Sequence, residues 1–325
     1  MFKHARLEIS WAPVKAEVFW LDTRGFNPGP SQTMANLKIN ETAIVNSVAC
    51  APLKKRVAFH VGEILVSIFK SRATRVESGG QVGSAKLLDR VIRNGLRAQA
   101  IRTSNFRRLR DLHRTYWKSQ AHKFASDCQF RFEEQFLAED STFLDNAEKY
   151  LACFCIDRIV EVGCGNGLML QYRSKRWPSV SQCVGIDIDP SVIENNARTY
   201  SDDNMQFPAT NPTDWMTHVP NRPALLITNG GVLEYFLREE VESLFTKLRK
   251  HAPCAILLIE TLGSDHDLEN DCETRLYGRE LSFSHNFPHL LRKCGFEVAS
   301  VRERVGKHGD RWFNVLGIAG QDVRS

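Results

Sequence analysis

Three glycines and an aspartate in the middle of the chain have the types and spacing of a nucleoside site. The stretch 158–167 is an apolar strand that runs into glycines at 163, 165 and 167, and a second apolar strand ends at Asp187. Glycine leaves no Cβ in the way, so a ligand can lie against the backbone where a helix starts. Asp187 follows at the distance at which α/β nucleotide sites place an acid for the ribose hydroxyls. These residues therefore predict a site for a ligand that contains a nucleoside.

The position of the third glycine and the acid before the loop indicate which kind of nucleoside ligand is expected. A dinucleotide site has the spacing G-x-G-x-x-G, whereas here the spacing is G-x-G-x-G and Leu168 stands at the dinucleotide position. Glu161 precedes the loop by two residues, where a carboxylate would repel a pyrophosphate but would suit an ammonium group. The pattern favours a nucleoside with a cationic group, and a dinucleotide enzyme or an ordinary glycine turn are the alternatives.

Together, these residues resemble the cofactor motif of the class I S-adenosylmethionine-dependent methyltransferases. The resemblance covers about residues 120–320. It implies S-adenosyl-L-methionine as the cofactor, with the glycine loop along its methionine and ribose parts and Asp187 on the ribose. The cofactor-binding residues that we expect on this basis are Glu161, Gly163, Cys164, Gly165, Gly167, Asp187, Ile188, Asn229 and Gly230.

The elements around these residues predict an α/β fold. Apolar strands at 182–187, 205–207, 224–230 and 254–260 alternate with helices at 190–200 and 234–251. Such alternation specifies a parallel sheet covered on both faces, with ligands at the carboxyl ends of the strands. A last helix begins at 287, a strand follows its glycine stop, and 311–319 is the final strand. We therefore expect a Rossmann-like, seven-stranded, mostly parallel sheet with helices on both faces and an antiparallel C-terminal strand.

Charge divides the chain into a basic N-terminal part and an acidic remainder. Residues 1–123 hold 22 Lys and Arg against 8 Asp and Glu, in a chain of net charge +5. We expect a poorly ordered segment at 1–50, in which Met34 could be the true start. A basic helical extension follows at 51–120, with amphipathic helices at 54–70 and 84–102, and a methyltransferase domain at 121–325. The basic helices could bind RNA phosphates, lie on an anionic membrane, or pack on the catalytic domain with solvated arginines.

Cysteine usage and hydropathy bear on the compartment. The nine cysteines form no C-x₂-C pair, and Cys153 and Cys155 are expected to be core residues of a helix. These features predict a reducing, cytoplasmic setting and no metal site. The sequence has neither an apolar run of membrane-spanning length nor the apolar core of a secretory signal.

The loop after the fourth strand bears on the methyl acceptor. Amino-methylating nucleic-acid enzymes carry an Asn/Asp-Pro-Pro-aromatic loop there to hold a flipped base, but this chain has Thr228-Asn-Gly-Gly. A small molecule is therefore the expected acceptor. The segment 276–289 is similar to a stretch of bacterial methyltransferases of sugar and polysaccharide biosynthesis.

That segment supplies the candidate acceptor residues. His285 could be the base that removes a hydroxyl proton, and the expected substrate residues are Tyr277, Arg279 and Asn286. The alternative is that Ser284 or Asn286 caps the next helix and His285 is structural. Further polar candidates are His266, Asp267 and His308, and the candidates for a lid over the cofactor are Tyr116, Trp117 and Phe124.

Three functions fit the sequence. The leading one is a methyltransferase that O-methylates a small molecule such as a sugar or glycoconjugate intermediate. The second is an RNA or protein methyltransferase that docks its substrate through the basic N-terminal half. The third is a cofactor-binding scaffold without turnover.

Overall fold

The computed structural model describes residues 53–79, 86–129, 132–200, 204–251, 253–306 and 309–320. The segment expected to be poorly ordered, residues 1–50 with Met34, lies outside the described residues. His308 also lies outside them, and the side chain of Phe124 is not described.

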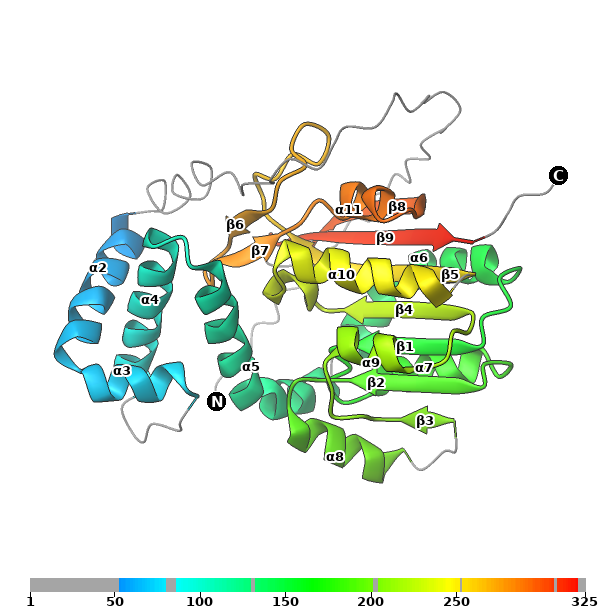
Figure 1. Cartoon of the computed structure of the whole chain (residues 1–325), viewed down its shortest axis with the longest axis horizontal. Coiled ribbons are helices and arrows are strands. Elements are labelled where there is room, and N and C mark those ends of the chain that lie inside the picture. The colour runs from blue at the N-terminus through cyan, green and yellow to red at the C-terminus, as the bar shows by residue number, and fades with distance from the viewer. Residues whose placement is uncertain are drawn as a thin grey trace, which may run out of the picture.

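A seven-stranded sheet forms the centre of the fold, in the order β3-β2-β1-β4-β5-β9-β8 (Figure 1). The first five strands in this order are parallel, and β9 pairs antiparallel with both β5 and β8. This arrangement confirms the predicted architecture. The strands are β1 Arg158–Val162, β2 Gln182–Ile186, β3 Met205–Gln206, β4 Ala224–Asn229, β5 Cys254–Leu262, β8 Glu297–Val305 and β9 Arg311–Ala319.

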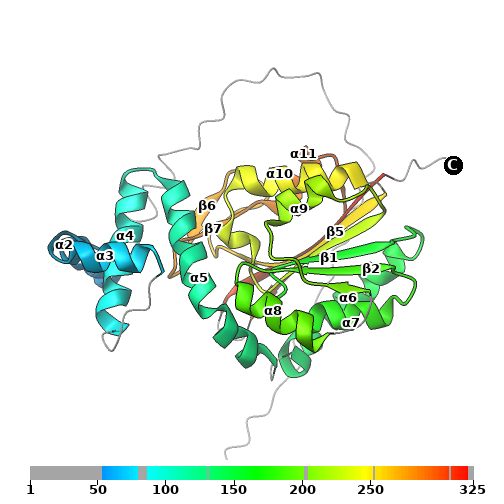
Figure 2. The ribbon, with the colours of Figure 1, turned by 60° about the horizontal axis from the view of Figure 1, so that its bottom comes forward.

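Two apolar layers attach helices to the two faces of the sheet. Successive side chains of a strand point to opposite faces, and in β1 Ile159 belongs to one buried cluster while Val160 and Val162 belong to the other. Figure 2 shows helices on both sides of the sheet. On one side lie α6 Ala138–Leu151, α7 Leu168–Arg176 and α8 Pro190–Thr199, and on the other α9 Pro212–His218, α10 Arg238–Leu248 and α11 Phe287–Lys293.

The boundary of α8 follows from local chemistry. Asp189 is its N-cap, and the side chain accepts a hydrogen bond from the backbone N–H of Ser191 at 2.9 Å. Pro190 takes the first helical position, where no N–H is needed. Asp189 thereby fixes where α8 starts, directly after Asp187.

Three expectations about local structure were wrong. The helix expected at 234–251 is broken: a short 3₁₀ helix, η2 Leu233–Tyr235, comes first, and α10 begins only at Arg238. An unpredicted hairpin, β6 Arg275–Tyr277 with β7 Ser282–Ser284, occupies the segment expected to bind the acceptor. Cys153 and Cys155 are exposed, because α6 ends at Leu151 before it reaches them.

Ahead of α6, the described residues form the helices α2 Leu53–Ile68, α3 Lys70–Glu77, α4 Lys86–Arg102 and α5 Phe106–Gln129. The first three form a lobe beside the sheet, and α5 lies between this lobe and the sheet (Figures 1 and 2). A π-helical turn, η1 Phe132–Leu137, leads from α5 toward α6. The expected domain boundary at 120 therefore falls inside α5. None of the described helices is both long and apolar enough to cross a bilayer.

The lobe depends on a close contact between α2 and α4. A Cβ added at Gly95 would lie 2.2 Å from the carbonyl carbon of Gly62, and one added at Gly62 would lie 2.6 Å from the backbone nitrogen of Gly95. Backbone atoms of the two helices therefore touch, and only glycine at both positions allows this approach.

We expect Gly95→Leu to separate α2 from α4. Leucine is a good helix former, so the loss will come from the clash and not from helix propensity, and overpacking of this kind costs ~1–3 kcal/mol. Hydrogen exchange followed by mass spectrometry should show faster exchange of the α2 amides. Arg90→Ala, at an exposed position of α4, is the control, and unchanged α2 protection in Gly95→Leu would contradict this account.

Candidate active site

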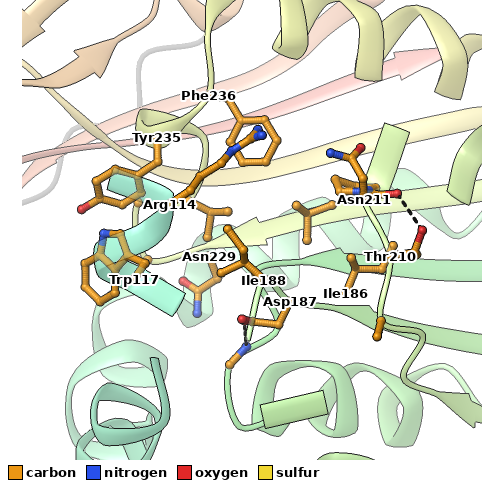
Figure 3. A pocket seen from close by; sticks show the side chains of 18 of the residues that line it. Arg114, Trp117, Ile186, Asp187, Ile188, Thr210, Asn211, Asn229, Tyr235 and Phe236 are labelled. Carbon is orange, nitrogen blue, oxygen red and sulfur yellow. Dashed lines mark hydrogen bonds between the residues drawn. The ribbon is translucent and has the colours of Figure 1, made fainter. Parts of the chain in front are cut away.

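A cavity of about 420 Å³ lies at the carboxyl ends of β1, β2 and β4 (Figure 3). The side chains around it are mostly apolar, and a few polar groups stand among them. Its volume lies within the range of small-molecule sites. Of the expected cofactor residues, those that line the cavity are Gly163, Gly165, Asp187, Ile188, Asn229 and Gly230.

The glycines of the loop serve different purposes. A Cβ added at Gly165 or Gly230 would meet no protein atom within 4 Å, so both backbones face open space where a ligand can lie. Gly163 instead packs against Val232, and Gly167 packs against the ring of Tyr200, each at 2.6 Å from the added Cβ. Gly167 also begins α7 with φ +75°, which a residue with a side chain rarely adopts.

Asp187 joins the two loops that border the cavity. One carboxylate oxygen accepts a hydrogen bond from the backbone N–H of Gly165 and the other accepts one from Asp189, both at 3.0 Å. Burial raises the pKa of this carboxyl, although these N–H donors oppose the shift. A carboxylate has about four acceptor positions, so each oxygen can still accept a ribose hydroxyl.

Three expected cofactor residues support the loop without lining the cavity. Cys164 is buried, with its sulfur 3.8 Å from the amide nitrogen of Asn196, and Gly167 faces Tyr200. Glu161 is buried in β1, burial raises its pKa well above the usual range, and its Oε2 has no hydrogen-bond partner among the described residues. A buried carboxyl oxygen that lacks a donor next to this cavity suits an ammonium group or a bridging water.

Side chains from α5 and from the end of η2 close the other end of the cavity. Trp117, expected as a lid, lines it together with Arg114, Tyr235 and Phe236 (Figure 3). The Trp117 and Tyr235 rings lie 5.5 Å apart, and the Arg114 guanidinium lies 5.1 Å from the centre of the Phe236 ring. Sequence analysis missed three of these four residues. The i, i+3 spacing of Arg114 and Trp117 was the available signal, because it puts both on one helix face.

The other lid candidate, Tyr116, points elsewhere. Its ring packs against Trp117 at 5.6 Å and lies beneath the guanidinium of Arg93 at 4.6 Å. Tyr116 therefore supports Trp117 from outside the cavity.

His285, the expected base, is fully buried and does not line the cavity. Its Nε2 lies 3.2 Å from the carbonyl oxygen of Leu233 and 3.1 Å from that of Phe236, and its Nδ1 lies 2.9 Å from the hydroxyl of Thr274. Burial lowers its pKa to about 4, so the ring is neutral at pH 7. Both ring nitrogens are engaged, which corresponds to the structural role considered as the alternative.

The expected substrate residues also lie away from the cavity. Asn286 caps α11 by accepting from the backbone N–H of His289 at 3.0 Å, and its amide donates to the carbonyl oxygens of Leu268 and Asp271. Arg279 is exposed in the turn between β6 and β7. The hydroxyl of Tyr277 donates a hydrogen bond to Glu234, behind the cavity wall.

The minor polar candidates do not reach the cavity either. His266 is buried, with its Nδ1 2.8 Å from the hydroxyl of Ser284. Asp267 is exposed and accepts hydrogen bonds from the backbone N–H groups of Glu269 and Asn270.

Two carboxyls, that of Glu234 in η2 and that of Glu260 in β5, have raised pKa values. Burial raises the pKa of Glu234 to about 7 and the pKa of Glu260 to about 8. Glu260 accepts a hydrogen bond from the backbone N–H of Leu233 at 3.0 Å, and so fixes the first residue of η2. Near pH 7, the Glu260 carboxyl is therefore largely protonated.

Residues 103–301, more than half of the chain, match a family model described as a methyltransferase domain. The chain belongs to this methyltransferase family. No curated protein sequence matches it.

Solved structures of similar fold include three proteins with low sequence identity. LepI in its complex with SAM is 13% identical over 53% of this chain and 46% of LepI, with a TM-score of 0.40. DesVI of Streptomyces venezuelae is 12% identical over 61% of this chain and 98% of DesVI, with a TM-score of 0.44. The cyclase SpnF is 11% identical over 55% of this chain and 80% of SpnF, with a TM-score of 0.41. This chain thus spans about half the length of LepI.

S-adenosylmethionine is the cofactor that the glycine loop and Asp187 led us to expect, and the residues at the cavity fit this group. The open backbone at Gly165 and Gly230 leaves room for a ligand against the strand ends. Asp187 has acceptor positions for the ribose, and the buried oxygen of Glu161 lacks a donor among the described residues. An adenosine group with an attached ammonium supplies the matching donors.

We expect Asp187→Ala to weaken S-adenosylhomocysteine binding about ten- to a hundredfold. Hydrogen bonds to a charged group contribute ~1.5–3 kcal/mol, and ~1.4 kcal/mol is a factor of ten. Isothermal titration calorimetry measures the change. The control is Glu194→Ala, because Glu194 is well exposed on α8, and an affinity unchanged by Asp187→Ala would refute the ribose assignment.

We expect the free energy of unfolding of Glu260→Gln to rise relative to that of the wild type as the pH increases from 5 to 8. The pKa of Glu260 is raised in the folded state, so its contribution to stability is complete at low pH and is lost as the pH rises through about 8. The difference in free energy of unfolding between the variant and the wild type should grow by up to ~1.4 kcal/mol per pH unit. Urea unfolding at several pH values measures it. A difference that does not depend on pH would mean that Glu260 ionises normally.

Proposed function

We propose that this methyltransferase transfers the methyl group to a hydroxyl oxygen of a small molecule, such as a sugar or glycoconjugate intermediate. The observation that carries the proposal is the aromatic end of the cavity, where Trp117, Tyr235 and Phe236 surround space continuous with that beside Gly165 and Asp187. A concave site with aromatic walls and a few polar groups is typical of small-molecule binding.

The residues around the cavity divide between cofactor and acceptor. Gly163, Gly165, Gly230 and Ile188 would contact the cofactor along its length, and Asp187 would hold its ribose. When bound, S-adenosylmethionine supplies a methyl group on a sulfonium centre, which is already activated for transfer. The chain's main task is therefore to align the acceptor oxygen with that carbon and to exclude water.

Arg114 and Asn229 are the polar groups that can orient ligands at the acceptor end. Arg114 is held by Glu240, whose carboxylate accepts its hydrogen bond at 3.1 Å, and it remains a cation available to a carboxylate of the cofactor or the acceptor. Asn229 ends β4 and offers both an amide donor and a carbonyl acceptor. We assign Asn229 to the acceptor hydroxyl.

The carboxyl of Glu234 would receive the acceptor's proton by way of Tyr235. As the carbon–oxygen bond forms and the carbon–sulfur bond breaks, the hydroxyl proton must leave. Glu234 precedes Tyr235 in η2 and shares a side-chain hydrogen bond with it, and burial raises the pKa of Glu234 to about 7, which suits proton transfer near neutral pH. His285 has no part in this proposal, because Leu233 and Phe236 occupy its Nε2.

Labelled S-adenosylmethionine and a cell extract test the acceptor class. We expect the label in small hydroxyl-bearing molecules. We also expect Trp117→Ala to raise the acceptor KM about tenfold or more, because truncation removes an aromatic wall worth ~1–3 kcal/mol, while cofactor affinity changes little. Tyr150→Ala, at an exposed aromatic position outside the cavity, is the control.

The same experiment separates the other two functions. Label that stays with RNA or protein, and disappears from the polymer after nuclease or protease digestion, would favour docking through the basic N-terminal half. Binding of S-adenosylhomocysteine without transfer to any fraction would favour a scaffold. Either result would overturn the proposal.

A further inference from the structure

Helix α2 has apolar side chains on two opposite faces. Phe59 and Gly62 are buried on the face toward α4. On the opposite face, an apolar stripe is exposed: Val57 by 54%, Val61 by 42%, Ile64 by 46% and Ile68 by 64%. At 3.6 residues per turn these four positions fall within about 60° of one another. Contiguous apolar side chains exposed on a surface mark an interaction site, so we expect a partner to cover this stripe.

The stripe points away from the rest of the described structure. Both views show α2 at the outer edge of the lobe, with α5 and the sheet beyond α4 (Figures 1 and 2). Two more exposed apolar side chains, Phe69 at 42% and Leu87 at 64%, lie at the end where α2 gives way to α3 and α4 begins. The ion pair of Arg72 with Asp89, 2.6 Å long, joins α3 to α4 at this end.

The lobe carries a surplus of positive charge. Residues 53–102, which make up the lobe, contain 11 Lys or Arg and three Asp or Glu. All three acids are already paired, Glu63 with Arg102, Glu77 with Arg108 and Asp89 with Arg72. Exposed cations of the lobe that form no ion pair with another described residue are Lys70, Arg75 and Arg90. The remaining charge is thus free to act on a partner.

We propose that this lobe docks on an anionic lipid surface, with the α2 stripe inserted at the boundary between headgroups and acyl chains. An exposed apolar helix face within a basic segment is the pattern of interfacial helices, and free Lys and Arg side chains attract an anionic leaflet. The stripe would contact the acyl chains, and the surplus of cations would attract anionic headgroups.

Two other occupants fit these observations less well. A second copy of the chain would bring two strongly basic lobes together, and the like charges would oppose that contact. RNA would use the cations, but its phosphates make no use of a stripe of valine and isoleucine. An anionic lipid surface uses both features.

Co-sedimentation of the full chain with vesicles tests the proposal. We expect binding to vesicles of equal parts phosphatidylcholine and phosphatidylglycerol, weakening as salt is raised, and little binding to phosphatidylcholine alone. The double variant Ile64→Glu/Ile68→Glu should lower the partition coefficient at least ~tenfold, since each isoleucine contributes more than a factor of three when buried. The charge variant Lys70→Glu/Arg90→Glu should lower binding to the anionic vesicles only.

Val305→Glu is the matched control, because Val305 is 73% exposed on β8, in the sheet and outside the lobe, and it should bind vesicles as the wild type does. Thermal unfolding and S-adenosylhomocysteine affinity should be unchanged in all variants, which shows that the fold is intact. No binding to anionic vesicles at low salt would overturn the proposal. So would an equal loss in Val305→Glu. A dimer in sedimentation velocity that the stripe variant dissociates, or retention of RNA in place of vesicles, would also overturn it.

Discussion

The carboxylate of Asp187 is the contact on which the site depends. It accepts backbone hydrogen bonds from Gly165 and Asp189, and so joins the loop after β1 to the loop after β2. The parallel register makes this possible, because it pairs Val162 with both Ile186 and Thr228 and brings three strand ends to one level. Once these ends are level, the glycine loop, Asp187 and Asn229 must border the same cavity.

Burial of acids shapes the electrostatics of this region. Desolvation raises the pKa values of Glu161, Glu234 and Glu260, so these carboxyls favour their neutral forms more than exposed ones do. Asp187 can remain charged more easily because two N–H groups donate to it. Charge at the cavity is therefore concentrated on Asp187 and Arg114, at opposite ends, where the low local dielectric strengthens their effect on a ligand.

The hairpin β6–β7 and the residues after it shape the cavity from a distance. His285 holds the carbonyl oxygens of Leu233 and Phe236 by its Nε2, and Thr274 donates to its Nδ1 if the ring carries its proton on Nε2. These contacts fix η2, which presents Tyr235 and Phe236 to the cavity. The segment that was expected to bind the acceptor therefore holds η2 in place, through the contacts of His285 with backbone carbonyls and of Tyr277 with Glu234.

The sequence by itself determined the alternating elements, the seven-stranded sheet and the glycine loop, because each strand, helix and turn follows from residues that are close together in the chain. Only the tertiary structure decided which distant side chains meet that loop. Arg114 and Trp117 reach it because α5 packs across the strand ends, and Tyr235 reaches it because the chain breaks between η2 and α10. A histidine beside an asparagine looks the same in sequence whether exposed or buried, and it is burial that makes His285 structural.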